Sequence, residues 1–143
     1  MKVRSTRTVS AVLAVLAQQR APEAEEMLHA ILEVRYRLWP LNQPEAWQAR
    51  HTLARCMQAQ GRLAEAEAEL RATLATVEPR HADRSEVLAI RSTLALVLLL
   101  DEQVDAAIEV YERLLADRRR LLGDTHLDTL QVEHALRRLR DGD

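Results

Sequence analysis

Apolar and small residues recur along this 143-residue chain at a spacing of 41 or 42 residues. Sliding the sequence on itself by that distance aligns three columns of residues. They are Ala11, Leu53, Leu94 and Leu136 in the first column, Ala24, Ala66 and Ala107 in the second, and Leu28, Leu70 and Tyr111 in the third. A fixed period of this length indicates a structural unit that is repeated three times, followed by the beginning of a fourth.

Each unit is predicted to contain two helices. In the second unit the first helix is expected over about residues 45–60 and the second over about 63–77, with Gly61 at the break. The segments "WPLNQP", "VEPRHADR" and "LGDTH" carry the Pro, Gly and short polar residues that separate one unit from the next. The whole pattern predicts seven helices. They are three pairs over about residues 5–39, 45–79 and 86–122, and a lone capping helix over 127–140.

The helix starts repeat at the same interval. An acid follows a short polar residue by three positions at Asn42 and Glu45, at Asp83 and Glu86, and at Thr125 and Asp128. This is the spacing of a capping box, in which the polar side chain accepts a hydrogen bond from the first turn. We therefore expect Asn42, Asp83 and Thr125 to be the cap residues.

Small residues at fixed places in each unit indicate close helix contacts. These are Ala54, Ala66, Ala95 and Ala107. A single pair of helices cannot bury its own apolar face and needs a copy of itself beside it. The sequence thus predicts one all-α domain over residues 1–143, built as a solenoid of stacked helix pairs.

The composition agrees with an all-helical fold and excludes several functions. The chain has 48% hydrophobic residues, only 3 Gly and 4 Pro, and is rich in strong helix formers. Its 20 basic and 22 acidic residues give a net charge of −2, which argues against general binding of nucleic acid or of a membrane surface. No run approaches the ~20 apolar residues that a membrane span requires. The lone Cys56 excludes an internal disulfide and suits the cytoplasm.

The first 17 residues allow two interpretations. Basic residues precede "VSAVLAVLA", as they do in a secretory signal that is later cleaved. We favour the first helix of the first repeat unit, because the register of the repeat continues through this segment.

These residues resemble the tetratricopeptide repeat family. The family's pattern of Leu, a small residue, Gly, Ala and a large residue is met by Leu53, Ala54, Gly61, Ala66 and Leu70. The third unit keeps the pattern but has Glu102 in place of Gly. The period and the linker "RRRLLGDTHLDTL" are similar to kinesin-light-chain-type repeats, which are abundant in bacterial regulatory proteins. HEAT and armadillo repeats have a similar period, but Gly61 and the alanine columns favour the tetratricopeptide family.

The resemblance implies a right-handed α–α superhelix whose first helices line a concave groove. In this family the groove receives an extended peptide or a helix from another protein. The corresponding columns are Gln48, His51, Arg55 and Gln58 in the second unit, Ala89, Ser92, Leu96 and Leu99 in the third, and Gln131, His134 and Arg138 in the last helix. Kinesin-light-chain-type repeats often have Asn in the columns of His51, Ser92 and His134, and this chain does not. The expected function is a non-catalytic interaction module, an adaptor or scaffold, without a cofactor or metal.

The segment "STLALVLLL", residues 92–100, is apolar on all sides from Leu94 onward. One interpretation is a central helix that its own neighbours bury, and the other is a hydrophobic seat for a partner or for a second copy of the chain. The first helix also lacks a polar face. We therefore predict that Val9, Leu13 and Leu16 take part in self-association against Leu96 and Leu99, giving a homodimer.

Candidate catalytic groups are few. His51 and Cys56 have no acid placed to orient them as a nucleophilic pair, and no two His residues have metal-ligand spacing. His51 and Arg55 share a helix face and could hold a carboxylate, or could simply be solvated. The arginines at 118–120 and 137–140 are interpreted as helix C-terminal charge. The alternative function is a small enzyme or small-molecule sensor that uses the groove as a pocket.

Overall fold

The structure is a computed structural model that describes residues 11–35 and 44–142. Within those ranges the chain forms helices joined by turns, with no strand. Residues 11–17 are helical. They are followed by α2 (Ala21–Arg35), α3 (Pro44–Ala59), α4 (Leu63–His81), α5 (Ser85–Leu100), α6 (Val104–Leu122) and α7 (Leu127–Arg140). The predicted all-α solenoid is confirmed.

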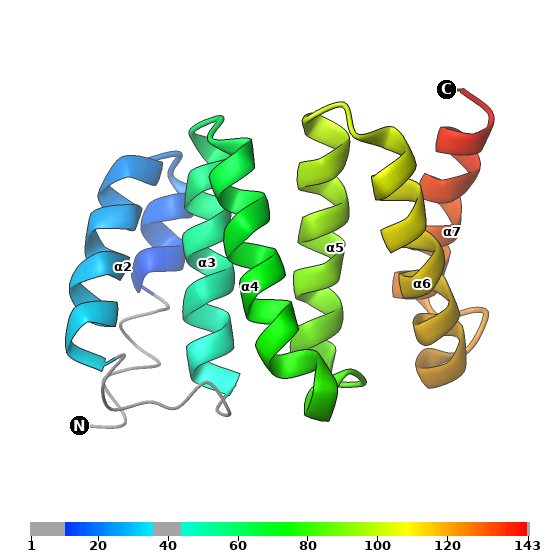
Figure 1. Ribbon diagram of the computed structural model, residues 1–143, viewed down its shortest axis with the longest axis horizontal. Coiled ribbons are helices and arrows are strands. Elements are labelled where there is room, and N and C mark those ends of the chain that lie inside the picture. The colour runs from blue at the N-terminus through cyan, green and yellow to red at the C-terminus, as the bar shows by residue number, and fades with distance from the viewer. Residues whose placement is uncertain (1–10, 36–43, 143) are drawn as a thin grey trace.

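The helices stand in a row, each packed against the next along the chain (Figure 1). The helices α2 and α7 lie at opposite ends of the row. The inner helices α3 and α5 also contact each other directly. Between α5 and α7, in contrast, no pair of Cα atoms comes within 8 Å. The interface between the second and third units is therefore closed on the inner side, whereas the next one is open.

The turn inside each helix pair has one residue in the left-handed backbone conformation, at the same position of the repeat. Gln19, Gly61 and Glu102 all have a φ between 61° and 76°. In each case the amide of the following residue donates to the carbonyl five residues before it, as Arg62 does to Met57 at 2.9 Å. This bond is typical of a helix that ends through a left-handed residue. The common turn geometry explains why the three pairs keep one register even though only the second has glycine.

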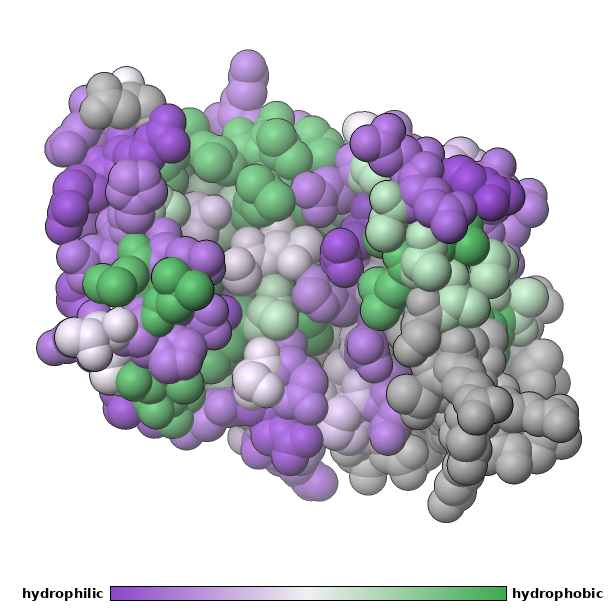
Figure 2. Space-filling view, turned by 180° about the vertical axis from the view of Figure 1, so that it is seen from behind, coloured by the Kyte–Doolittle hydropathy of each residue, from purple (hydrophilic) through white to green (hydrophobic). Residues whose placement is uncertain are grey.

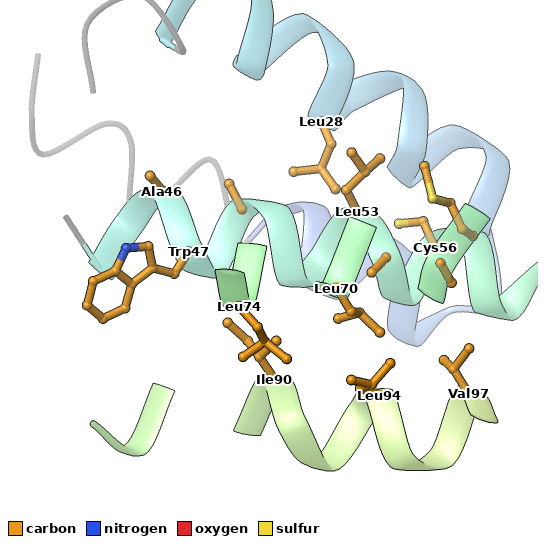
Figure 3. Close-up of a cluster of buried hydrophobic side chains, with 14 of the residues drawn as sticks. Leu28, Ala46, Trp47, Leu53, Cys56, Leu70, Leu74, Ile90, Leu94 and Val97 are labelled. Carbon is orange, nitrogen blue, oxygen red and sulfur yellow. The ribbon is translucent and has the colours of Figure 1, made fainter. Parts of the chain in front are cut away.

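The core follows the repeat register closely. Ala54, Ala66, Ala95 and Ala107 are all completely buried, as expected for places where helices approach closely. The buried apolar side chains of α3 and α5 occupy equivalent positions, from Ala46 and Val87 at the start to Met57 and Leu98 at the end. Figure 3 shows that Leu28, Leu70 and Leu94, from three different helices, project into the space around α3.

A buried arginine joins three helices. Arg91 of α5 has a side chain that is 3% exposed. Its Nε and Nη2 donate to Oε2 of Glu78 on α4 at 3.2 and 2.7 Å, and its Nη1 donates to Oδ2 of Asp117 on α6 at 2.6 Å. A buried guanidinium is tolerated when carboxylates accept its hydrogen bonds. This cluster, Glu78–Arg91–Asp117, fixes how α4, α5 and α6 lie relative to one another.

The helix caps differ from the prediction. Asp83 is not the cap of α5, because the N-cap is Arg84, whose side chain makes no capping hydrogen bond. Both Asp83 carboxylate oxygens instead accept from Arg120, at 3.2 and 2.7 Å. Thr125 is likewise displaced by His126, whose Nδ1 accepts from the amide of Asp128 at 3.1 Å. Asn42 lies outside the described residues.

The helix α4 continues past its predicted end at Val77. It runs through Pro79 to His81, although proline removes one hydrogen bond of the last turns. The additional turn places the His81 ring against the buried Trp47, with ring centroids 4.8 Å apart. This aromatic contact offsets the lost backbone bond.

The outer face of α7 is charged. Leu130, Glu133 and Arg137 occupy the register positions of Leu88, Arg91 and Ala95, which in α5 are buried against α6. Glu133 accepts from Arg119 at 3.1 Å and from Arg137 at 2.9 Å. One further pair, Arg140 with Glu112, joins α7 to α6 at 3.1 Å. This face of α7 is therefore mostly charged, whereas the equivalent face of α5 is buried.

Candidate functional site

The predicted groove residues lie on the inner helices α3, α5 and α7. In Figure 1, α3 and α7 lie behind α4 and α6. Figure 2 shows the molecule from the opposite side. Apolar residues gather at the upper middle of this face, beside strongly polar surface. Gln48, Arg55, Leu96, Gln131, His134 and Arg138 are exposed, whereas His51, Gln58, Ala89, Ser92 and Leu99 are partly buried.

One column of equivalent residues crosses the groove and has an apolar side chain between two basic ones. Arg55 on α3, Leu96 on α5 and Arg138 on α7 hold equivalent register positions. The Leu96 side chain is 40% exposed, and Leu100 one turn later is 52% exposed. The face therefore offers an apolar centre with one guanidinium on each side.

A cleft of about 420 Å³ lies between the first turns of α3 and α5. Its walls include Pro44, Trp47, Gln48, His51 and Ala89. We call it the α3–α5 cleft. The indole of Trp47 is almost completely buried, so it forms the floor rather than a free surface.

His51 closes the groove-side contact between α3 and α5. Its Nε2 lies 2.6 Å from Oγ1 of Thr93, and that hydroxyl can also donate to the carbonyl of Ala89 at 3.3 Å. Burial, and secondarily the positive charge of Arg55, lowers the pKa of His51 from 6.5 to about 4. The imidazole is therefore neutral at physiological pH and already engaged, which leaves Arg55 as the charged member of the predicted pair.

The depressed pKa of His51 predicts an acid-sensitive fold. Between pH 6.5 and about 4 the unfolded chain binds a proton at this imidazole and the folded chain does not, so stability falls as pH falls through that window. The loss is expected to reach at most about 3 kcal/mol. In urea unfolding followed by circular dichroism at several pH values, His51→Gln should flatten this part of the profile. An unchanged slope would contradict the assignment, and the exposed His134→Gln controls for loss of an imidazole in general.

A second and smaller crevice lies between α5 and α7. It measures about 170 Å³, and its lining includes Ser92, Tyr111, Arg118 and Gln131. Arg118 reaches it from α6, with a side chain that is 12% exposed. The Arg118 Nε is buried and has no hydrogen-bond partner among the described residues. We call this the α5–α7 crevice.

Arg118 is the site residue that the sequence interpretation missed. Its neighbours Arg119 and Arg120 do behave as helix C-terminal charge, since they lie in the last turn of α6 and pair with acids at the surface. Arg118 instead points inward. The repeat register contains the missing signal, because Arg118 falls in the column of the buried Val77.

Three further possibilities are a reactive cysteine, a metal site and a membrane-spanning helix. Cys56 is buried, and burial raises the pKa of its thiol to about 11, so it stays protonated and is a poor nucleophile. In the described ranges no group of three His, Cys, Asp or Glu residues could hold a metal ion. None of the described helices combines the length and the apolar character needed to cross a membrane.

The predicted self-association residues lie only partly within the described ranges. Val9 is outside them. Leu13 and Leu16 are partly buried, and Leu16 packs against the main core cluster. Their role in a contact between chains stays a prediction.

Comparison with known proteins relates the chain to a repeat family. Residues 87–128, which include most of α5 and all of α6, match the sequence profile of the tetratricopeptide repeat. The sequence has no significant match among curated proteins.

Solved structures match the fold over almost the whole chain. Repeats described as a kinesin light chain with nearly identical TPR-like repeats, from Podosopora anserina, superpose with a TM-score of 0.85 and 24% identity. That match covers 95% of this chain and 65% of the other. A single-substitution variant of the same protein gives a TM-score of 0.84 at 23% identity, with the same coverage. BtubC (BKLC) from P. vanneervenii gives 0.65 at 16% identity, covering 98% of this chain and 64% of the other.

The protein is therefore an all-α solenoid of tetratricopeptide-like repeats. Its third unit matches the tetratricopeptide repeat in sequence, and its fold is similar to that of the TPR-like repeats in the kinesin light chain structure. The chain spans 65% of the length of that structure. Tetratricopeptide repeats typically serve as protein–protein interaction modules and are generally non-catalytic.

Proposed function

We propose that this chain is a single repeat domain that acts as a non-catalytic interaction module. It binds a segment of another protein across the inner face of α3, α5 and α7. The observation that carries the proposal is the column Arg55, Leu96 and Arg138, in which an exposed leucine lies between two exposed guanidiniums. Exposed apolar surface with a polar rim is typical of a protein-binding site.

The chemistry of this column specifies the kind of partner. A segment with an apolar side chain flanked by carboxylates would bury the apolar group on Leu96 and Leu99, and would place its acids near Arg55 and Arg138. Arginine suits this role because its planar guanidinium binds a carboxylate through two parallel hydrogen bonds.

The test compares a groove variant with a matched variant on the outer face. Tagged wild-type protein, the double variant Arg55→Glu/Arg138→Glu, and Arg71→Glu on α4 are used to capture proteins from lysate, with quantitative mass spectrometry. A true groove partner is retained by wild type and by Arg71→Glu, and the double variant should bind its purified form at least about tenfold more weakly in calorimetry. Equal binding by the double variant and wild type would show that the groove is not the site.

Self-association is a second proposed use of the same surface. A homodimer would cover Leu96 and Leu99 with apolar side chains of a second copy, including Leu13 and Leu16 of the first helix. Light scattering at high micromolar concentration should then show a dimer, and Leu96→Glu should shift the mass to that of a monomer because an unpaired charge would be buried in the contact. The exposed control Leu127→Glu, at the start of α7, should remain a dimer. A monomeric wild type would assign Leu96 to a different protein.

A small-molecule sensor is the second candidate function, and the α3–α5 cleft favours it. Its volume of about 420 Å³ lies within the usual range for ligand sites. A ligand specific to the folded state raises the melting temperature by mass action. Screening of metabolites by thermal shift, repeated with Gln48→Trp to fill the cleft, distinguishes this function from peptide binding on the column of Arg55.

A further inference from the structure

The interface between α3 and α5 provides an internal reference for the interface between α5 and α7. Both are built from equivalent register positions, so the residues at each position can be compared directly. At the floor of the first interface lie Leu70 and Val77, both almost completely buried. At the floor of the second, the same columns hold Tyr111 and Arg118. A phenol and a guanidinium have replaced two core aliphatic side chains.

The contacts on the groove side of the two interfaces also differ. His51 and Thr93 meet across the first at 2.6 Å and close it. Their equivalents at the second interface are Ser92 and Ala135, and an alanine side chain has no group with which to form such a bond. This agrees with the absence of close backbone contact between α5 and α7. The α5–α7 crevice therefore opens onto the groove above Tyr111 and Arg118.

Arg118 is incompletely satisfied in this position. Its one ion pair is with Asp128, where Nη1 lies 3.5 Å from Oδ2, and its guanidinium donates no hydrogen bond among the described residues. Arg91 shows the contrast, since its nearly buried guanidinium makes three hydrogen bonds to two carboxylates. Burying a polar group without partners opposes folding. Valine, the residue of the equivalent column, would avoid that penalty.

We propose that the α5–α7 crevice binds a carboxylate side chain of the partner segment that lies in the groove. Arg118 is the anchor of this site. The inference rests on the proposed function and adds a specific acidic residue of the partner, bound apart from the column of Arg55. Asp128 faces Nη1, whereas Nη2 has no partner among the described residues, so Nη2 can donate a hydrogen bond to the incoming carboxylate. Ser92 and Gln131 add a hydroxyl and an amide at the mouth.

Charge and size select a carboxylate over a phosphate. Asp128 contributes a negative charge to the lining, which would repel a phosphate dianion more strongly than a monoanion. A crevice of about 170 Å³ also matches one short acidic side chain and not a larger ligand. Burial raises the pKa of Tyr111, so its hydroxyl remains protonated and can donate to an anion at neutral pH.

The test uses two small probes that differ only in charge. N-acetyl-glutamate amide and N-acetyl-glutamine amide are titrated into the ¹⁵N-labelled protein at low salt, and the shifts of the Arg118 side chain and of Gln131 are followed by NMR. The glutamate probe should bind at least about fivefold more tightly than the glutamine probe. Arg118→Val should abolish that preference, and Arg119→Gln, which removes the adjacent exposed arginine, should retain it. Equal binding of the two probes to wild type would overturn the proposal, as would an unchanged preference in Arg118→Val. Inorganic phosphate is titrated in parallel, and tighter binding of phosphate than of the glutamate probe would also overturn it.

A stability measurement separates a ligand anchor from a structural residue. Arg118→Val restores the column residue found at Val77 and removes an unsatisfied guanidinium, so its melting temperature should be higher than that of wild type. A lower melting temperature would assign Arg118 a structural role and overturn the proposal. Because the probes need no partner protein, their failure leaves groove binding standing. The failure of groove binding is measured separately, by partner capture with Arg55→Glu/Arg138→Glu.

Discussion

Replacing Arg91 with alanine is expected to lower the free energy of unfolding by about 3–5 kcal/mol. The substitution removes the buried guanidinium that Glu78 and Asp117 share. It leaves each carboxylate with one exposed arginine at 3.2 Å, Arg113 and Arg120, while both carboxylates remain largely shielded from water. Removing one partner of a buried ion pair is more harmful than removing the whole pair, because the uncompensated charge stays behind. Urea unfolding at pH 7, followed by circular dichroism, measures the loss.

Two variants make the Arg91 experiment decisive. The triple variant Arg91→Met/Glu78→Gln/Asp117→Asn removes all three charges and should recover a large part of the lost stability. Arg71→Ala removes an exposed arginine that pairs with Glu67 on the same helix, and it should change stability by less than about 1 kcal/mol. A loss below about 1 kcal/mol in Arg91→Ala would show that the cluster does not hold α4, α5 and α6 together.

Replacing Leu70 with alanine is expected to lower the free energy of unfolding by about 2–5 kcal/mol. Leu70 is 1% exposed and belongs to the main core cluster, which joins residues of α2, α3, α4 and α5. The loss has two parts, the transfer of the removed methyl groups and the cavity that stacked helices cannot close. An unchanged m-value in chemical denaturation would show that the variant exposes as much surface on unfolding as the wild type does.

The matched control for Leu70 is Leu100→Ala. Leu100 lies at the end of α5 and is 52% exposed, so its truncation should change stability by less than about 0.5 kcal/mol. Similar losses in Leu70→Ala and Leu100→Ala would contradict the core assignment.

The repeat could be predicted from sequence because its signal is a packing requirement. Every buried apolar position of α3 has a buried apolar counterpart in α5, and that coincidence appears in the amino-acid sequence as aligned columns of apolar and small residues. Helix ends were less predictable, because they depend on contacts between units. Asp83 has the spacing of a cap, yet its carboxylate is bound by Arg120 from α6, a residue 37 positions away. The continuation of α4 to His81 depends likewise on a ring that packs on Trp47.

The candidate site was predictable in position more than in chemistry. The family resemblance indicated the inner helices and the columns of Arg55, Leu96 and Arg138. It did not reveal that His51 is engaged by Thr93, since that bond depends on how closely α3 and α5 approach. Arg118 was missed because arginines near a helix C-terminus have an ordinary explanation. Comparing Arg118 with Val77 in its column would have identified it.

The charged outer face of α7 limits how copies of this chain can polymerise. Solenoid units that stack head to tail make an open contact, which grows into a filament when nothing closes it. A helix added to α7 would strip water from Glu133, Arg137 and Arg140, and would compete with their pairs to Arg119 and Glu112. Exposed ion pairs keep their hydration. Burying them against an apolar surface adds a desolvation penalty that can exceed their mutual attraction. Stacking of copies through this face of α7 is therefore disfavoured.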